Sequence, residues 1–254
     1  MDELQSYLYS EHSGISERYK KKIRILRGLA VFLCTAAAVA LYFFHIRLPL
    51  VPKMFVTELS ALPELLLTFA YGPLYGIAAC LVKNAVHMLV MGNTMIPDTA
   101  NFITESVFLL AAGALFAVKT EETAHKTERP VSRGERLKWM LGGALAGMAA
   151  ALVAQFGVTL IYVYPSLTEK YSTAYSTEIL LQAYQTTVTG LRAHLPAALA
   201  SLLPDIHSLW QGVLMVNLPI TLVKLCVVTL LTVAAYNLLL RALHVKIPKS
   251  ENQI

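Results

Sequence analysis

The sequence predicts an all-α integral membrane protein, a bundle of six transmembrane helices with an extracellular amphipathic insert between the fifth and sixth. Hydrophobic residues make up 56% of the 254 positions and charged residues only 15%, whereas soluble domains carry roughly 25% charged residues. Charged residues are absent from 28–44 and from 139–168, and Lys224 is the only one in 206–240. A helix needs about 20 mostly apolar residues to cross a bilayer, so these runs are predicted spans.

The first span is predicted at 26–46, directly after a basic cluster that ends at Arg27. Its long polar leader and extended apolar run favour an uncleaved span over a secretory signal. The connector 47–53 contains two prolines and is too interrupted to continue the helix. The first span is therefore expected to end before this connector.

The next three spans are predicted at 58–71, 74–91 and 100–118. Gly72-Pro73 separates the first two of these because this dipeptide disfavours helical continuation. The polar stretch 119–138 that follows is expected to be a solvated loop.

The fifth span is predicted at 138–163, closed by Pro165, and the sixth at 208–242. The segment between them, 166–205, is semi-polar, and its apolar residues recur at a helical spacing. They are Ile179, Leu180, Ala183, Tyr184 and Val188. This spacing predicts an amphipathic interfacial helix, or two, interrupted by Pro196 and Pro204.

Basic residues cluster before the first span, in 119–138 and after the last span. Because cytoplasmic flanks of membrane proteins carry the excess of Lys and Arg, both termini are predicted to be cytoplasmic. The domain organisation is then a cytoplasmic segment 1–25, a membrane domain 26–243 with its insert 166–205, and a cytoplasmic tail 244–254. The net charge of +5 is accounted for by these clusters, so no nucleic-acid partner is expected.

The sequence lacks the signatures of catalytic and metal sites. Cys34, Cys80 and Cys226 all lie in apolar segments without a Cys or His at ligand spacing, which argues against zinc and against a disulfide framework. No phosphate loop, His-Glu-x-x-His or Gly-x-Ser-x-Gly motif is present. We therefore expect neither an enzyme nor a cofactor.

Lys224 is the leading candidate for a functional residue, because ionisable groups inside spans are costly and usually serve a function. Two interpretations are open. It contacts a ligand, or it forms a structural ion pair with one of three carboxylates, those of Glu58, Glu64 and Glu105.

Other polar groups in the spans form weaker candidates. Asn84 and His87 share one helix face, and Lys83 precedes them. Asp98 or Thr99 is a possible N-cap of the fourth span, followed by Asn101 and Glu105. Thr159 and Thr221 complete the set, although threonines often bond back to their own helix.

Small residues four apart let helix backbones approach closely. Ala36 and Ala40 in the first span and Gly143 and Gly147 in the fifth have this spacing.

Several segments together resemble the substrate-binding S component of energy-coupling factor (ECF) vitamin transporters, most closely the riboflavin-specific type. The resemblance covers about 26–118 and 138–243. The segments that carry it are 49–63, Thr68-Phe-Ala-Tyr-Gly-Pro-Leu-Tyr-Gly76, Val82-Lys-Asn-Ala-Val-His87, Pro97-Asp-Thr-Ala-Asn-Phe102 and Leu218-Pro-Ile-Thr-Leu-Val-Lys224.

The resemblance implies a six-helix bundle that captures a vitamin, here riboflavin, from outside in a pocket capped by the connector of the first two spans. It implies assembly with one transmembrane coupling subunit and two ATPase subunits, with Ala36 and Ala40 facing the coupling subunit. Lys224 corresponds to a ligand-contacting lysine of the family. Thr221 and Thr159 stand where asparagines are usual, and Glu58 stands where an aspartate is usual.

Two further alternatives accompany this hypothesis. Within the family, the substrate is a different vitamin or small heterocycle. Outside it, the chain is a membrane assembly subunit that binds no small molecule, or a membrane-embedded enzyme.

Overall fold

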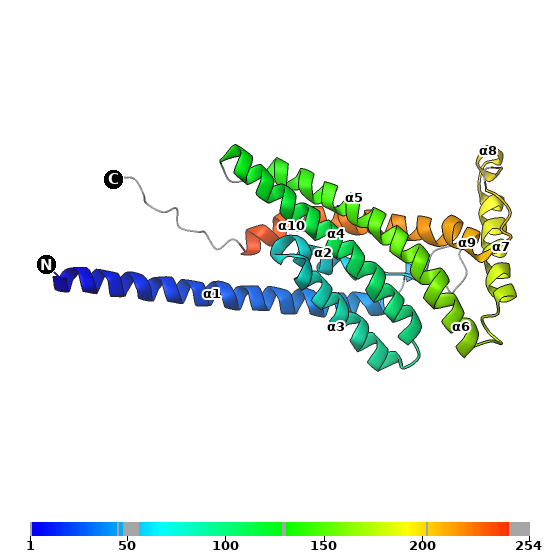
Figure 1. Ribbon diagram of the computed structural model, residues 1–254, viewed down its shortest axis with the longest axis horizontal. Helices are drawn as coiled ribbons and strands as arrows, with labels where there is room; N and C mark the ends of the chain where they lie inside the picture. Colours follow the sequence, from blue (N-terminus) through cyan, green and yellow to red (C-terminus); the bar gives the residue numbers. More distant parts are fainter. Residues whose placement is uncertain (1, 45, 48–55, 129–130, 202, 244–254) are drawn as a thin grey trace.

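The computed structural model describes residues 2–44, 46–47, 56–128, 131–201 and 203–243. Long helices dominate it and lie side by side in a bundle, with α1 extending well past its neighbours at the N-terminal end (Figure 1). The one sheet in these segments is a pair of two-residue antiparallel strands, β1 (Ile46–Arg47) and β2 (Val56–Thr57). The fold is therefore helical, as predicted.

Five helices in the described ranges are long and apolar enough to span a membrane. The bundle is formed by α1 (Asp2–Phe43), α3 (Pro73–Met91), α4 (Met95–Thr127), the run from α5 (Arg133–Val158) through η1 (Thr159–Val163) to α6 (Tyr164–Lys170), and the run from α9 (Leu209–Gly212) through η2 (Val213–Asn217) to α10 (Leu218–Leu243). The chain is thus a multi-pass membrane protein.

The second predicted span is shorter than expected. Helix α2 (Ala61–Tyr71) has 11 residues, which gives a length of about 16 Å, roughly half of the hydrocarbon thickness. Pro63 lies in its first turn, where the missing N–H has no helical partner to lose. The count of six full spans is therefore not reproduced, although α2 is apolar and packed inside the bundle.

The solvated loop predicted over 119–138 is wrong for most of its length. α4 continues to Thr127. Its last turns are stabilised by ion pairs along one helix face, which Glu122 forms with Lys119 at 2.7 Å and with Lys126 at 2.6 Å. α5 then begins after Ser132, whose hydroxyl accepts from the Glu135 amide in a capping box. These local interactions leave only residues 128–132 between the two helices.

Pro165 does not end the fifth span. The π-helical segment η1 precedes it, and Pro165 lies in the first turn of α6. The wider π-helical turn tolerates a residue without an N–H at this position, so the helix runs on to Lys170.

Tight contact between α4 and α5 forms the centre of the bundle. A Cβ on Gly143 would lie 2.5 Å from the carbonyl oxygen of Ala112, and one on Gly147 would lie 2.7 Å from that of Phe108. The prediction that these glycines allow close helix approach is confirmed. Ala36 and Ala40 lie exposed on α1, whereas Ala38 between them is buried.

The segment 166–205 contains a helix as predicted, α7 (Thr177–His194), followed by the short α8 (Ala197–Ala200) after Pro196. α7 stands across one end of the bundle (Figure 1). Its buried face is formed by Leu180, Tyr184 and Val188, which pack with Val213 and Val216 of η2, while Ile179 is exposed. This face packs on protein, so α7 belongs to the bundle.

Candidate functional site

A cavity of about 460 Å³ lies where α7 meets the ends of the long helices. Its walls come from α1, α3, α4, the α5–η1–α6 run, α7 and the η2–α10 run. They include the side chains of Tyr42, Glu58, His87, Asp98, Asn101, Gln155, Thr159, Tyr164, Tyr184, Asn217, Thr221 and Lys224.

A smaller cavity of about 150 Å³ adjoins it. The two share Asn101, Gln155, Thr221 and Lys224 in their linings, and the smaller one adds Thr104 and Glu105.

Most of the predicted site residues line the main cavity. Lys224, Thr221, Thr159, His87, Asn101 and Glu58 all contribute to its wall. Lys83 and Asn84 lie outside that lining and are buried among α2, α3 and α4. Their predicted role in ligand contact stays a prediction, since neither side chain lines this cavity.

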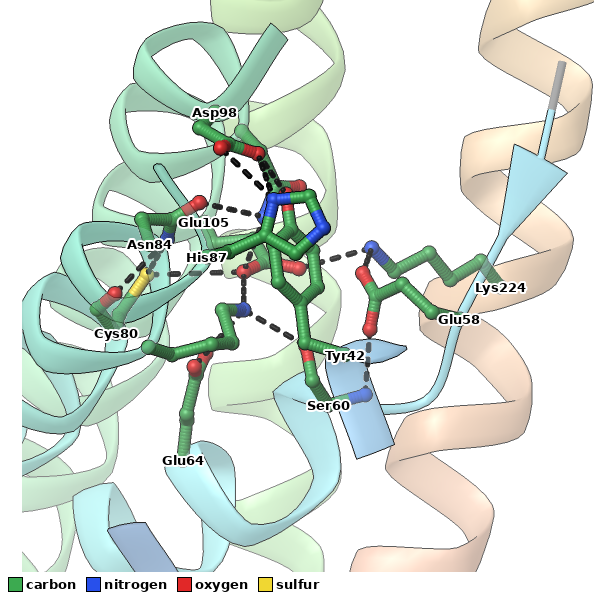
Figure 2. A network of polar contacts seen from close by, with 12 residues as sticks. Tyr42, Glu58, Ser60, Glu64, Cys80, Asn84, His87, Asp98, Glu105 and Lys224 are labelled. Atoms are coloured by element: carbon green, nitrogen blue, oxygen red, sulfur yellow. Dashed lines mark hydrogen bonds and ion pairs between the residues drawn. The ribbon is translucent and has the colours of Figure 1, made fainter. Parts of the chain in front are cut away.

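Lys224 reaches the cavity while paired with two carboxylates. Its Nζ lies 2.5 Å from Glu58 Oε1 and 2.8 Å from Glu105 Oε1 (Figure 2). Glu58 also accepts from the Ser60 amide at 2.5 Å. The geometry is thus compatible with both interpretations of Lys224, ligand contact and a structural ion pair, since the ammonium is ion-paired and also part of the cavity wall.

Lys83 occupies the centre of a second polar group behind this wall. Its ammonium donates to Ser60 Oγ at 2.7 Å, pairs with Glu64 Oε1 at 2.9 Å and also binds Glu105 Oε2. Asn84 donates to the Cys80 carbonyl at 2.8 Å. Because Glu105 contacts both lysines, it connects the buried group to the cavity.

The third polar group surrounds Asp98. The predicted N-cap role for Asp98 or Thr99 is wrong, because α4 begins earlier and Thr94 is its N-cap. One turn inside the helix, Asp98 Oδ2 lies 2.8 Å from His87 Nδ1, and Oδ1 accepts from the Tyr42 hydroxyl at 2.8 Å. Figure 2 shows Tyr42, His87 and Asp98 close together beside Glu105.

Both π-helical segments lie at the level of the cavity and contribute to it. η1 supplies Thr159 and Val163, and η2 supplies Asn217. Such segments are frequent at functional sites because they turn side chains out of the regular helical spacing. Sequence reasoning missed Gln155 and Asn217, and polar amides inside an apolar run were the available signal.

Tyr184 connects α7 to the helices that line the cavity. Its hydroxyl donates to Asn217 Oδ1 at 2.8 Å and also bonds the hydroxyl of Tyr164. Burial raises the pKa of the Tyr184 phenol, which therefore stays a neutral donor. The ring lies against Gly212, where a Cβ would be only 2.3 Å from its Cδ2.

A family model described as "ECF transporter, substrate-specific component" matches residues 25–236. The riboflavin transporter RibU of Staphylococcus aureus (strain TCH60) is 33% identical over 93 residues, 37% of this chain and 49% of that protein. The riboflavin transporter FmnP of Bacillus subtilis (strain 168) is 26% identical over 97 residues, 37% of this chain and 51% of that protein.

The chain therefore spans about half the length of the curated relatives it matches. A solved structure titled "Structure and mechanism of the S component of a bacterial ECF transporter" aligns with a TM-score of 0.54 and 21% identity. The alignment covers 86% of this chain and 97% of that one. At this identity the match establishes the fold.

Proposed function

The chain belongs to the family of substrate-specific components of ECF transporters, and on this premise we propose that it captures riboflavin for transport across the cell membrane. The family consists of transport components, which sets aside the alternatives of a membrane-embedded enzyme and of an assembly subunit. Riboflavin is proposed as the transported ligand, with no cofactor role.

The observation that carries this proposal is the cavity of about 460 Å³ at the end of the bundle. Ligand sites of small molecules typically have about 300–1,000 Å³ and combine apolar walls with a few polar groups. Here Tyr42, Tyr164 and Tyr184 offer aromatic surface, and Val163 and Ile220 offer aliphatic surface. A flat tricyclic ring with polar edges fits such a lining.

The polar groups of the wall match the acceptors and donors of a flavin. Lys224 is a charged donor for a ring carbonyl or ring nitrogen, and such a bond contributes about 1.5–3 kcal/mol. Gln155 and Asn217 are amides that both donate and accept, and Thr159 and Thr221 add hydroxyls. The alternative substrates are another vitamin or a small heterocycle with the same pattern of polar edges.

The proposed partners are one transmembrane coupling subunit and two ATPase subunits. Ala36 and Ala40 support a contact on α1, since both are small and exposed. The predicted cap of the pocket, the connector 47–53, lies almost wholly outside the described residues, as do Met1 and the tail 244–254. We propose that both termini are cytoplasmic and that α7 lies on the opposite side.

The test is to purify the protein in detergent and record its absorbance spectrum, since a bound flavin is yellow. Titration of the flavin-free protein with riboflavin, followed by fluorescence quenching, gives the affinity. Thiamine and biotin serve as matched competitors. We expect the protein to quench riboflavin fluorescence, and we expect neither competitor to reverse this quenching. A colourless protein that does not quench riboflavin but binds another vitamin would replace the proposed substrate.

A further inference from the structure

Five ionisable side chains form one buried network that begins in the cavity wall and extends behind it. The carboxyl groups are those of Glu58, Glu64 and Glu105, and the ammonium groups are those of Lys83 and Lys224. Figure 2 shows Glu105 between Glu64 on one side and Lys224 with Glu58 on the other. If all five were ionised, three negative charges would face two positive ones.

The partners of each carboxyl group identify which one is least compensated. Glu105 uses one oxygen for Lys224 and the other for Lys83. Glu58 is held by Lys224 and by the Ser60 amide. Among the described residues, Glu64 pairs only with Lys83, at 2.9 Å, and that ammonium also contacts Glu105 and Ser60.

The position of Glu64 makes an unbalanced charge costly. Its side chain is 0% exposed, and within the described part of the chain neither carboxyl oxygen has a hydrogen-bond partner of good geometry. The α2–α3 contact around it is tight, because a Cβ on Gly76 would be 2.7 Å from the Glu64 carbonyl oxygen. A buried carboxyl group without a full set of partners takes up a proton in preference to carrying charge.

We propose that Glu64 is a proton-binding site: it holds one proton, and this proton neutralises the network of Glu58, Glu64, Glu105, Lys83 and Lys224. The proton comes from water and returns to it when Glu64 ionises. With Glu64 neutral, two ammonium groups face two carboxylates.

The other polar groups around the network do not supply the missing positive charge. From α3, the Cys80 thiol points at Glu105 Oε2 at 3.6 Å and is uncharged. From α1, the Tyr42 ring faces Lys83, with Nζ 4.8 Å from its centre. From α3 and α4, His87 and Asp98 contact each other at 2.8 Å, and Asn84 and Asn101 are neutral amides.

The proton on Glu64 is linked to the cavity through Glu105. When Glu64 ionises, it competes with Glu105 for Lys83, so Glu105 relies more on Lys224. Lys224 is then less free to donate to a ligand. This consequence rests on the proposed function, and it predicts that ligand affinity falls as the pH is raised through the titration of Glu64.

The direct test is infrared spectroscopy of the intact protein without ligand. The carbonyl stretch of a protonated carboxylic acid is expected near neutral pH, and it should be absent from Glu64→Gln. Glu169→Gln removes an exposed carboxyl group outside the network, so it is the matched control and should keep the band. A wild-type spectrum without the band, or a band retained in Glu64→Gln, would overturn the proposal. Because wild-type protein gives the first readout, the test does not depend on the folding of a variant.

A second arm measures riboflavin affinity against pH. We expect wild-type affinity to fall roughly 5-fold or more at high pH, within the usual range of site coupling. For Glu64→Gln we expect an affinity that does not change with pH.

Glu64, Cys80 and Glu105 also place oxygen and sulfur atoms within 4.8 Å of one another. Ligand binding that depends on sodium, with no infrared band, would therefore assign a cation to this position and refute proton binding. Absence of riboflavin binding with the infrared band present would refute the proposed function alone.

Discussion

Lys224 Nζ lies 2.8 Å from Glu105 Oε1, in an ion pair that joins α10 to α4 next to the cavity. Glu58 approaches the same ammonium from the segment before α2. The lysine thus has two functions to lose on substitution, one in the stability of the bundle and one in the cavity. Measurements of stability and of affinity on the same variants separate them.

Lys224→Met is predicted to weaken riboflavin binding roughly 10- to 100-fold. It is also predicted to destabilise the ligand-free protein by about 3–5 kcal/mol, because removing one partner leaves buried carboxylates without compensation. Fluorescence quenching and thermal unfolding of the ligand-free protein check the two effects.

The matched control is the double variant Lys224→Met/Glu58→Gln, which removes a negative charge together with the positive one. Its unfolding midpoint should recover toward that of the wild type, while riboflavin affinity stays low. If Lys224→Met lowers the midpoint but binds riboflavin normally, Lys224 is a structural residue only.

Gly212→Ala is predicted to displace α7, because the new Cβ would lie 2.3 Å from the Tyr184 ring. Overpacking of this kind costs about 1–3 kcal/mol, and the displaced wall should weaken riboflavin binding. Gly157→Ala is the control on another helix, since its Cβ would meet nothing within 4 Å. That variant should be as stable as wild type or more so, by up to about 1 kcal/mol. Equal affinity and midpoint for both variants would show that α7 is not part of the site.

The helices of this bundle could be predicted because long apolar runs carry their own signal. Lys224 could be predicted for a related reason, since a charge in such a run is conspicuous. The segments that connect the helices were harder to predict. Lys119, Glu122 and Lys126 look like a solvated loop in the sequence, but their spacing also supports the last turns of a helix. Composition alone does not distinguish these two structures.

The walls of the cavity were predictable only in part, because they form between distant segments. Tyr184 was expected on the apolar face of an interfacial helix, and its bond to Asn217 spans 33 residues. The local sequence around Tyr184 does not indicate that it contacts Asn217, and the sequence around Asn217 does not indicate a contact with Tyr184. The π-helical turn that points Asn217 inward is likewise set by tertiary packing.

The membrane topology is predicted from the basic clusters and is testable by cysteine labelling. Lys126→Cys is a suitable probe of the α4–α5 turn, because the Lys126 side chain is 72% exposed, whereas Ser132 caps α5 and should be kept. Thr173→Cys probes the exposed segment before α7. Cys34 and Cys226 are replaced by alanine first.

An impermeant thiol reagent added to intact cells is expected to label Thr173→Cys and to leave Lys126→Cys unlabelled until the membrane is opened. This result would place the termini and the α4–α5 turn in the cytoplasm. The reverse pattern would invert the orientation of the whole bundle.

Ala36→Trp and Ala40→Trp are predicted to prevent assembly with the coupling subunit while leaving riboflavin binding intact. Both alanines lie exposed on α1, so a larger side chain there extends away from the core of this chain. At a helix–helix contact between subunits, however, an indole would hold the two backbones apart, and the packing of small residues would be lost.

Ala38→Trp is the matched control, because Ala38 is 0% exposed and its substitution should disrupt the fold itself. Copurification of the coupling subunit and riboflavin quenching are measured on the same preparations. The expected outcome is lost copurification with normal quenching for Ala36→Trp, and loss of both for Ala38→Trp. Normal copurification of Ala36→Trp would move the subunit contact to another face of the bundle. Lost quenching in a variant with an unchanged unfolding midpoint would show that this face of α1 contributes to ligand binding.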